Sequence, residues 1–383
     1  MHTKLDVIVT LVFILIQWRI STLLVRRWPY QVTWVSIGAV NLLLALCYAL
    51  SISELVSRFH LPPRFSLMAG ATALAYLVTA TTTLIAYTIM EWAKKALTSP
   101  NLDPGRRRLL DLAGLAVVTS PVAVLGYGTF VQRTDFRVNE MDMPLPGLPA
   151  DLDGLRLLQL SDIHMSAFLS EREFARVVDE SNQLRAHVAL VTGDLISSRG
   201  DPLEACLRQV ARLRSDAGTF GCLGNHERYA GVEDQTTTAA ARMGIRFLRH
   251  RSELLRFGGA ALNLAGVDYE KMQLDSAGYL RGAERLKAPD AVNVLLSHNP
   301  DVFPAAARQG YNLLLAGHTH GGQVTVEILD QAINPARFIT PYVSGVYRDG
   351  NAVAYVTRGI GTIGLPTRVG AAPEITLLRL RKA

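Results

Sequence analysis

The chain has 383 residues, of which 49% are apolar, a formal net charge of +6 and a mean hydropathy of +0.19. This length suffices for a domain with a large core and a further region, and the positive hydropathy indicates membrane spans. The first 131 residues hold 11 Lys and Arg against 5 Asp and Glu, whereas residues 132–383 hold 28 of each. That neutral region lacks the basic face of a phosphate-backbone binder, so the composition argues against a nuclease and against a nucleic-acid partner.

Four segments of the first third are predicted to cross a membrane, at residues 5–25, 31–53, 65–90 and 112–131. No charged residue occurs in the last three of them, and a span needs about 20 apolar residues. The first segment contains Arg19 near one end, where its aliphatic stem would let the guanidinium reach the headgroups. Buried helices of a soluble core are the alternative, which three uncharged stretches of this length disfavour.

Basic residues between these segments favour one orientation of the chain. Arg26 and Arg27 follow the first segment, and Lys94, Lys95 and residues 106–108, all Arg, lie between the third and the fourth. The positive-inside rule places these loops in the cytoplasm. The prediction is therefore a multi-pass membrane protein whose downstream domain lies outside the cytoplasm.

The chain after residue 131 alternates between short apolar runs and amphipathic helices. A Pro- and Gly-rich linker with an entry strand is expected at 132–154 and a domain at 155–383. Its helices are expected at 170–184, opened by a capping box of Ser170 and Glu173, and at 201–215. Strands are expected at 155–162, 187–194, 219–226, 261–267, 293–297, 312–316, 353–357 and 375–380. This alternation predicts an α/β layered domain.

Polar residues of similar kinds follow five of these strands. The segments are Ser161-Asp162-Ile163-His164, Gly193-Asp194, Gly224-Asn225-His226-Glu227, Ser297-His298-Asn299 and Gly317-His318-Thr319-His320. Each alone is typical of an ordinary turn, but ligands of open α/β sheets bind beyond the carboxyl ends of the strands. Carboxylate, imidazole and amide oxygen are ligands for divalent transition metals, and the absence of cysteine argues against a structural zinc site.

The number of candidate ligands predicts two metal ions rather than one. Seven side chains and one further histidine exceed what a single metal ordinarily binds. Two metals about 3.5–4 Å apart that share a carboxylate can activate a water and hold a phosphoryl group between them. The pattern therefore predicts hydrolysis of a phosphate ester.

The segments SDIH, GD, GNHE, SHNP and GHTHGG resemble those of the calcineurin-like metallophosphoesterase superfamily, over about residues 138–383. The stretches DLDGLRLLQLSDIH, AGHTHGGQV and RGIGTIGLPTRVGAAPEITLLRL are similar to a bacterial membrane-associated branch that includes UDP-2,3-diacylglucosamine-hydrolase-like phosphodiesterases. The resemblance implies a four-layer α/β/β/α sandwich with two divalent metals, Mn, Fe or Zn, between the sheets.

The resemblance also assigns roles to individual residues. It implies that Asp162, His164 and His320 bind the first metal, that Asp194 bridges, and that Asn225, His298 and His318 bind the second. His226 would face the substrate as a general acid or a phosphate contact. Arg358 and Arg368 are candidate contacts for phosphate or headgroup, with a solvated surface role as the alternative.

The sequence thus predicts a membrane-bound metal-dependent phosphoric ester hydrolase. It would act through metal-activated water on a mono- or diester, either lipid-linked or nucleotide-linked. A transporter or receptor with a regulatory phosphoesterase-fold domain is the alternative, but such proteins keep ionisable residues in mid-span, and the second to fourth segments have none. A silent binding module is disfavoured because every ligand position is intact.

Overall fold

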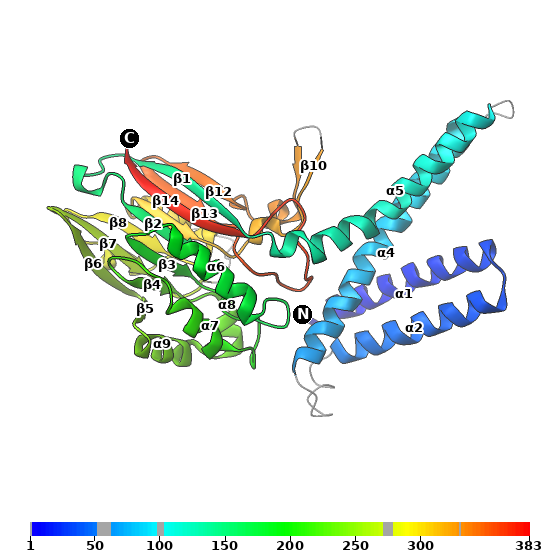
Figure 1. Cartoon of the computed structure of the whole chain (residues 1–383), viewed down its shortest axis with the longest axis horizontal. Helices are drawn as coiled ribbons and strands as arrows, with labels where there is room; N and C mark the ends of the chain where they lie inside the picture. The colour runs from blue at the N-terminus through cyan, green and yellow to red at the C-terminus, as the bar shows by residue number, and fades with distance from the viewer. Residues whose placement is uncertain (1, 52–62, 98–102, 271–278, 329–330) are drawn as a thin grey trace. The chain divides into compact units, whose positions relative to one another are not determined.

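The structure is a computed structural model that describes residues 2–51, 63–97, 103–270, 279–328 and 331–383. The chain divides into two compact units, Met1–Thr129 and Phe130–Ala383, here called the helical unit and the α/β unit (Figure 1). Each unit is described by itself.

The helical unit contains α1 (His2–Arg27), α2 (Gln31–Ser51), α4 (Pro63–Leu97) and α5 (Pro104–Phe130). Within the described residues, three helical stretches are long and apolar enough to cross a membrane: Gln31–Tyr48, Arg64–Leu97 and Pro104–Thr134. The predicted segment 5–25 is helical, as α1, but is not among these three. The three apolar helices are thus established, and a fourth span stays a prediction.

The start of α5 differs from the predicted boundary at residue 112. Asp103 Oδ1 accepts hydrogen bonds from the backbone N–H groups of Gly105 and Arg106, at 2.9 and 3.1 Å. An aspartate N-cap followed by proline at the first helical position is a favourable helix start. The three arginines at 106–108 therefore lie on the first turns of the helix and not in a loop.

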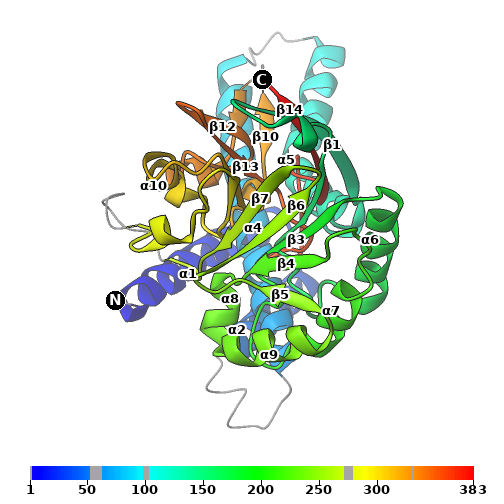
Figure 2. The ribbon, with the colours of Figure 1, turned by 90° about the vertical axis from the view of Figure 1, so that its left-hand side faces the viewer.

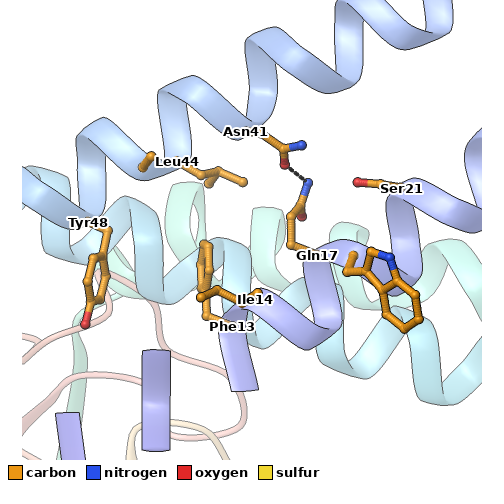
Figure 3. A pocket seen from close by; sticks show the side chains of 9 residues that line it. Phe13, Ile14, Gln17, Ser21, Asn41, Leu44 and Tyr48 are labelled. Carbon is orange, nitrogen blue, oxygen red and sulfur yellow. Dashed lines mark hydrogen bonds between the residues drawn. The ribbon is translucent and has the colours of Figure 1, made fainter. Parts of the chain in front are cut away.

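Polar side chains connect the helices of this unit. Gln17 of α1 donates a hydrogen bond to Asn41 of α2 and accepts one from Tyr76 of α4. The pair of Gln17 and Asn41 borders a cavity of about 480 Å³ between α1 and α2, lined mainly by apolar side chains (Figure 3). Polar groups in an apolar interior are costly unless paired, so this network favours one packing of the three helices.

Two six-stranded sheets form the α/β unit (Figure 2). The first has the order β1 (Arg137–Leu145), β14 (Glu374–Lys382), β2 (Arg156–Leu160), β3 (Val188–Thr192), β4 (Thr219–Cys222) and β5 (Ile245–Phe247). The second has the order β12 (Gly345–Asp349), β13 (Ala352–Val356), β9 (Leu313–Ala316), β8 (Val292–Leu296), β7 (Ala260–Gly266) and β6 (Arg251–Phe257). A separate hairpin joins β10 (Val326–Ile328) to β11 (Gln331–Ile333).

Strand direction explains where a site can form. Strands β2 to β5 are mutually parallel, and so are β7, β8, β9 and β13. Every residue of β3 and β8 is buried, as expected for parallel strands covered on both faces. The carboxyl ends of each parallel set therefore emerge along one edge of their sheet.

Helices pack against both sheets. The described ones are α6 (Glu171–Gln183), α7 (Leu203–Val210), α8 (Asn225–Ala230), α9 (Glu233–Arg242) and α10 (Phe303–Arg308). Side chains of α6, α7 and α9 share one core with the first sheet, and those of α10 share another with the second. A third core lies between the sheets. The predicted capping box of Ser170 and Glu173 opens α6 and is confirmed.

The segment 132–154 also belongs to this unit. It contains β1, which pairs with β14 along its whole length, and the 3-10 turns at Gln132–Thr134 and Ala150–Leu152. Further 3-10 turns lie at Ala283–Leu286, Pro300–Val302, His320–Gly322 and Pro335–Phe338. The buried cysteines Cys206 and Cys222 are free thiols.

Candidate metal centre

The predicted ligands gather at the carboxyl ends of five strands. They follow β2 (Asp162 and His164), β3 (Asp194), β4 (Asn225), β8 (His298) and β9 (His318 and His320). All are buried except His318, which is partly exposed. A hydrogen bond joins the sheets here, since His298 Nδ1 lies 2.7 Å from the carbonyl oxygen of Thr192 at the end of β3.

The backbone at these positions is unusual. Asp162, His164, Asp194, His318 and His320 all have positive φ angles, of 50°, 48°, 55°, 75° and 53°. Residues with a side chain rarely adopt this left-handed region, and such strain concentrates at functional sites. The surrounding sheets must therefore hold these turns in place, and the turns aim the ligands inward.

Neighbouring glycines leave room for the carboxylates. A Cβ atom added at Gly224 would collide with Asp194 Oδ1, and one added at Gly317 would collide with Asp162 Oδ2 and the hydroxyl of Ser161. Glycine is required at both positions because the backbone passes so close to the ligand oxygens.

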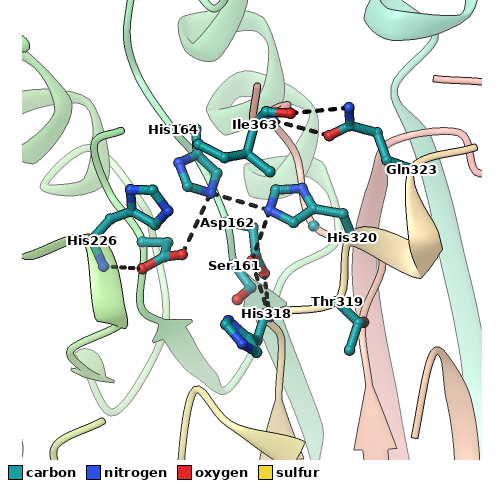
Figure 4. Close-up of polar contacts among 12 residues, drawn as sticks. Ser161, Asp162, His164, His226, His318, Thr319, His320, Gln323 and Ile363 are labelled. Atoms are coloured by element: carbon teal, nitrogen blue, oxygen red, sulfur yellow. Dashed lines mark hydrogen bonds and ion pairs between the residues drawn. The ribbon is translucent and has the colours of Figure 1, made fainter. Parts of the chain in front are cut away.

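The ligand atoms face one another at short distances. His164 Nε2 lies 3.1 Å from His320 Nε2, and His320 Nε2 lies 3.3 Å from Asp162 Oδ1 (Figure 4). Asp194 Oδ2 lies 3.0 Å from His298 Nε2 and 3.4 Å from His164 Nε2.

Three groups of side chains each bring their ligand atoms within 4.8 Å of one another. They are Asp162 with His164 and His320, Asp194 with His298 and His318, and Asp194 with His164 and His226. The first two are the two ligand sets predicted from the sequence, apart from Asn225.

Asn225 supplies an independent test of the fit to a metal. Its Oδ1 is buried and has no hydrogen-bond partner. Leaving a buried acceptor unsatisfied costs about 1–3 kcal/mol, and a cation would satisfy this oxygen. The donor set of carboxylate, imidazole and amide oxygen suits divalent Mn, Fe or Zn, so the residues fit the expected cofactor.

Electrostatics favour cation binding at the same place. Burial lowers the pKa of His164 to about 3 and that of His318 to about 4, so both rings are neutral near pH 7, the form that binds metals. Burial also opposes a charge on His298, but the carboxylates of Asp194 and Asp162 outweigh it and raise its pKa to about 10. The same two carboxylates that stabilise a proton on His298 would also attract a metal cation.

His226 lies beside the ligands and is partly exposed. Its backbone N–H donates to Asp194 Oδ1 at 2.9 Å, and its Nδ1 lies 2.5 Å from the carbonyl oxygen of Ser197. Since a carbonyl only accepts, Nδ1 carries the proton and Nε2 is the nitrogen that remains for chemistry. The ring also packs edge-on against His164, with centroids 4.7 Å apart, so its geometry suits either an acid or a ligand.

Glu227 follows His226 in the sequence, which left open either a role in orienting the imidazole or a place on the surface. Its side chain is fully buried and accepts hydrogen bonds from the backbone N–H groups of Asp194, Leu195 and Gly224, at 3.0, 2.7 and 2.8 Å. Glu227 therefore fixes the turn after β3 against the turn after β4. Glu227 is the third residue of α8, and its bond to the N–H of Gly224 closes the start of that helix. A glutamate three residues after a helix start is a pattern that the sequence already shows.

Two tyrosines add aromatic walls that the sequence did not reveal. Tyr269 is buried with its ring 5.4 Å from that of His318, and exposed Tyr229 has its ring 5.8 Å from that of His226. Burial raises the pKa of Tyr269 above its usual range, so its hydroxyl stays protonated and can only be a neutral donor or acceptor.

The two candidate arginines occupy different environments. Arg368 is fully buried, and its guanidinium donates to the carbonyl oxygens of Gly361, Ala371 and Arg358. Its donors are thus engaged behind His320, in contrast to the predicted contact with substrate. Arg358 is exposed and packs its aliphatic stem beside Gly321, next to the ligand His320.

Comparisons with known proteins identify chains that are similar to this one. The family model for calcineurin-like phosphoesterases matches residues 155–322. Among solved structures, the NAD nucleotidase of Haemophilus influenzae aligns over 54% of this chain and 45% of its own, with 13% identity and a TM-score of 0.37.

Two relatives extend the likeness in sequence. A metallophosphoesterase of Bacillus subtilis, itself uncharacterized, is 27% identical over 67% of this chain and 89% of its own length. A Bos taurus protein described as a transmembrane protein with metallophosphoesterase domain is 30% identical over 78% of this chain and 68% of its own length. The chain therefore belongs to the calcineurin-like metallophosphoesterase superfamily, a family of hydrolases that act on phosphoesters.

Proposed function

We propose that this protein is a membrane-bound phosphoesterase with two divalent metals. The first metal would be held by Asp162, His164 and His320, and Asp194 would bridge to the second. Asn225, His298 and His318 would complete that second set. The proposal rests on one observation: two buried carboxylates and four buried or half-buried imidazoles converge beside an amide oxygen that has no partner.

Bound cations would supply an activated water and stabilise the charge on the phosphoryl oxygens. The chain's own residues set the geometry around them. Glu227 keeps Asp194 in place through the backbone. With Nδ1–H bound to the carbonyl of Ser197, His226 would act as an acid in its doubly protonated form, giving the proton on Nε2 to the leaving oxygen and becoming neutral. Arg358, exposed beside the ligand loop, would contact a phosphate or headgroup.

The proposal extends to the layer order of the fold and to the class of substrate. The three cores of the α/β unit would be those of a four-layer α/β/β/α sandwich. The substrate would be a mono- or diester with a lipid or nucleotide moiety, as in the diacylglucosamine-hydrolase-like branch that the sequence resembles.

A hydrolysis screen of the purified full-length protein tests the function. Metal-stripped protein is supplied with Mn²⁺, Fe²⁺, Zn²⁺ or none, and phosphate monoesters and diesters are offered in parallel. We expect turnover of at least one ester class that depends on added metal and is lost with chelator. Equal turnover without metal, or none with any metal and any ester, would contradict the proposal.

We propose further that the α/β unit lies outside the cytoplasm. Lys94 and Lys95 lie in the last turn of α4, and three arginines lie near the start of α5. Basic residues at the ends of membrane spans favour the cytoplasmic side. A reporter active only outside the cytoplasm should be silent when fused after Leu97 and active when fused after Ala383. The reverse pattern would place the metal centre in the cytoplasm.

A further inference from the structure

An exposed apolar pair follows the metal-binding loop in the α/β unit. Phe338 is 91% exposed and Ile339 is 68% exposed, and they are adjacent in sequence. The other exposed large apolar side chains described in this unit beyond residue 131, Tyr229, Leu254 and Val346, are 64% exposed or less and stand singly. Single exposed apolar residues are ordinary, whereas two adjacent large apolar side chains that are both mostly exposed suggest a contact surface.

The backbone under this pair is held firmly. Asn334 Oδ1 accepts from the N–H of Ala336 at 2.9 Å, and the carbonyl oxygen of Ala336 accepts from the N–H groups of both Ile339 and Thr340 at 2.9 Å. Thr340 is buried and donates its hydroxyl proton to Asp301. The 3-10 turn Pro335–Phe338 and Ile339, here called the apex, therefore presents the two side chains outward from a fixed frame.

The apex is joined directly to the metal-binding loop. Asn334 Nδ2 donates to the carbonyl oxygen of Gly321 at 2.9 Å and to Thr325 Oγ1 at 2.8 Å. Gly321 follows the ligand His320, and a Cβ atom at Gly322 would collide with the Asn334 side chain. Strand β10 lies between loop and apex and projects from the α/β unit (Figure 1). A few hydrogen bonds thus connect the apex, and with it any surface that the apex contacts, to the candidate metal centre.

We propose that the apex inserts into the bilayer that holds the protein's own apolar helices, and that the substrate is a phosphoester lipid of that bilayer. This inference rests on the proposed function and names its substrate class. The α/β unit begins at Phe130, where the apolar helix α5 ends, so the tether keeps the bilayer at a high effective concentration. Exposed Arg337 beside the pair suits anionic headgroups, and large apolar side chains suit the interface.

Fluorescence quenching tests the membrane contact independently of activity. An environment-sensitive label is attached to Phe338→Cys in a Cys47→Ser background, because Cys206 and Cys222 are buried and burial raises their pKa. The full-length protein is placed in nanodiscs of phosphatidylcholine and phosphatidylglycerol. Lipids that carry a doxyl quencher should reduce the emission of the label at position 338. The reduction should be at least about twofold larger than for a matched label at Leu254→Cys, a position on edge strand β6.

Two outcomes of this experiment would overturn the proposal. Equal quenching at positions 338 and 254 would show that the apex does not enter the bilayer. Alternatively, the label at position 338 could become shielded from solvent as the protein concentration rises in detergent, with no quenching in nanodiscs. That result would assign the apex to a contact between two copies of the chain.

An activity comparison tests the substrate class. The double variant Phe338→Ser/Ile339→Ser should retain hydrolysis of a soluble nitrophenyl ester and lose about tenfold on a phosphoester lipid in nanodiscs, since two apolar contacts with the bilayer are removed. Leu254→Ser should change neither rate. An equal loss on both esters, or no loss on the lipid, would overturn the lipid assignment, whereas absence of all hydrolysis by the unmutated protein would refute the proposed function instead.

Discussion

Asp194→Asn is expected to lower the bound metal and reduce turnover by at least about 10³-fold, because the activation and charge stabilisation that metals provide are worth several kcal/mol. Asp194 Oδ2 lies near His164 of the first proposed ligand set and near His298 of the second, so both metals would depend on it. Its Oδ1 already accepts from the N–H of His226, and its Oδ2 faces His298 and His164. An amide that keeps the first bond must turn its NH₂ group towards the second pair, where a metal would have to bind.

The fold should survive this substitution. The turn that carries Asp194 is held through its backbone by Glu227, and the apolar cores do not include its side chain. Metal analysis of the purified variant, circular dichroism and turnover of a nitrophenyl ester decide the matter. Asp216→Asn is the matched control, since the Asp216 side chain is 73% exposed. Full metal content with ordinary turnover in Asp194→Asn would rule out the shared carboxylate.

His226→Ala is expected to keep its metals and to lose about 10²–10⁴-fold in turnover of alkyl phosphate esters, the usual worth of general-acid help. The loss on nitrophenyl esters should be much smaller, because a nitrophenolate departs without a proton and an alkoxide needs one. The structure supports this role through the His226 Nδ1 contact with the carbonyl of Ser197, which leaves Nε2 for the substrate.

The measurement must separate three roles for His226, since a ring nitrogen also lies within ligand distance of His164 and Asp194. Metal loss in the variant would make His226 a ligand and remove the need for Asn225. Equal losses on both ester classes with metal retained would make His226 a phosphate contact. His187→Ala is a suitable control, because this half-buried histidine lies on the amino side of β3, away from the ligands.

The α/β class of the fold and the clustering of the candidate ligands can be predicted from the sequence because they depend on short-range patterns. The largely apolar residues of β3 and β8, the capping box of α6 and the uncharged stretches of the apolar helices each indicate burial or a helix end within a few residues. The ligands are readable for a related reason. Parallel strands deliver their carboxyl ends to one edge, so similar polar segments after several strands indicate a shared site without any knowledge of distances.

The tertiary structure alone decided the roles of residues whose partners are distant in the chain. Arg368 appeared available to substrate, but carbonyl groups of a folded-back loop occupy its guanidinium. From the sequence, Glu227 could orient His226 or lie at the surface, and only the fold shows its carboxylate bound to the backbone after β3, more than thirty residues earlier. Phe338 and Ile339 are of residue types that are usually buried, and only the fold shows that they are exposed beside the metal-binding loop. The type of a side chain determines which contacts it can make. Three-dimensional packing determines whether its partner in each contact is water or another part of the protein.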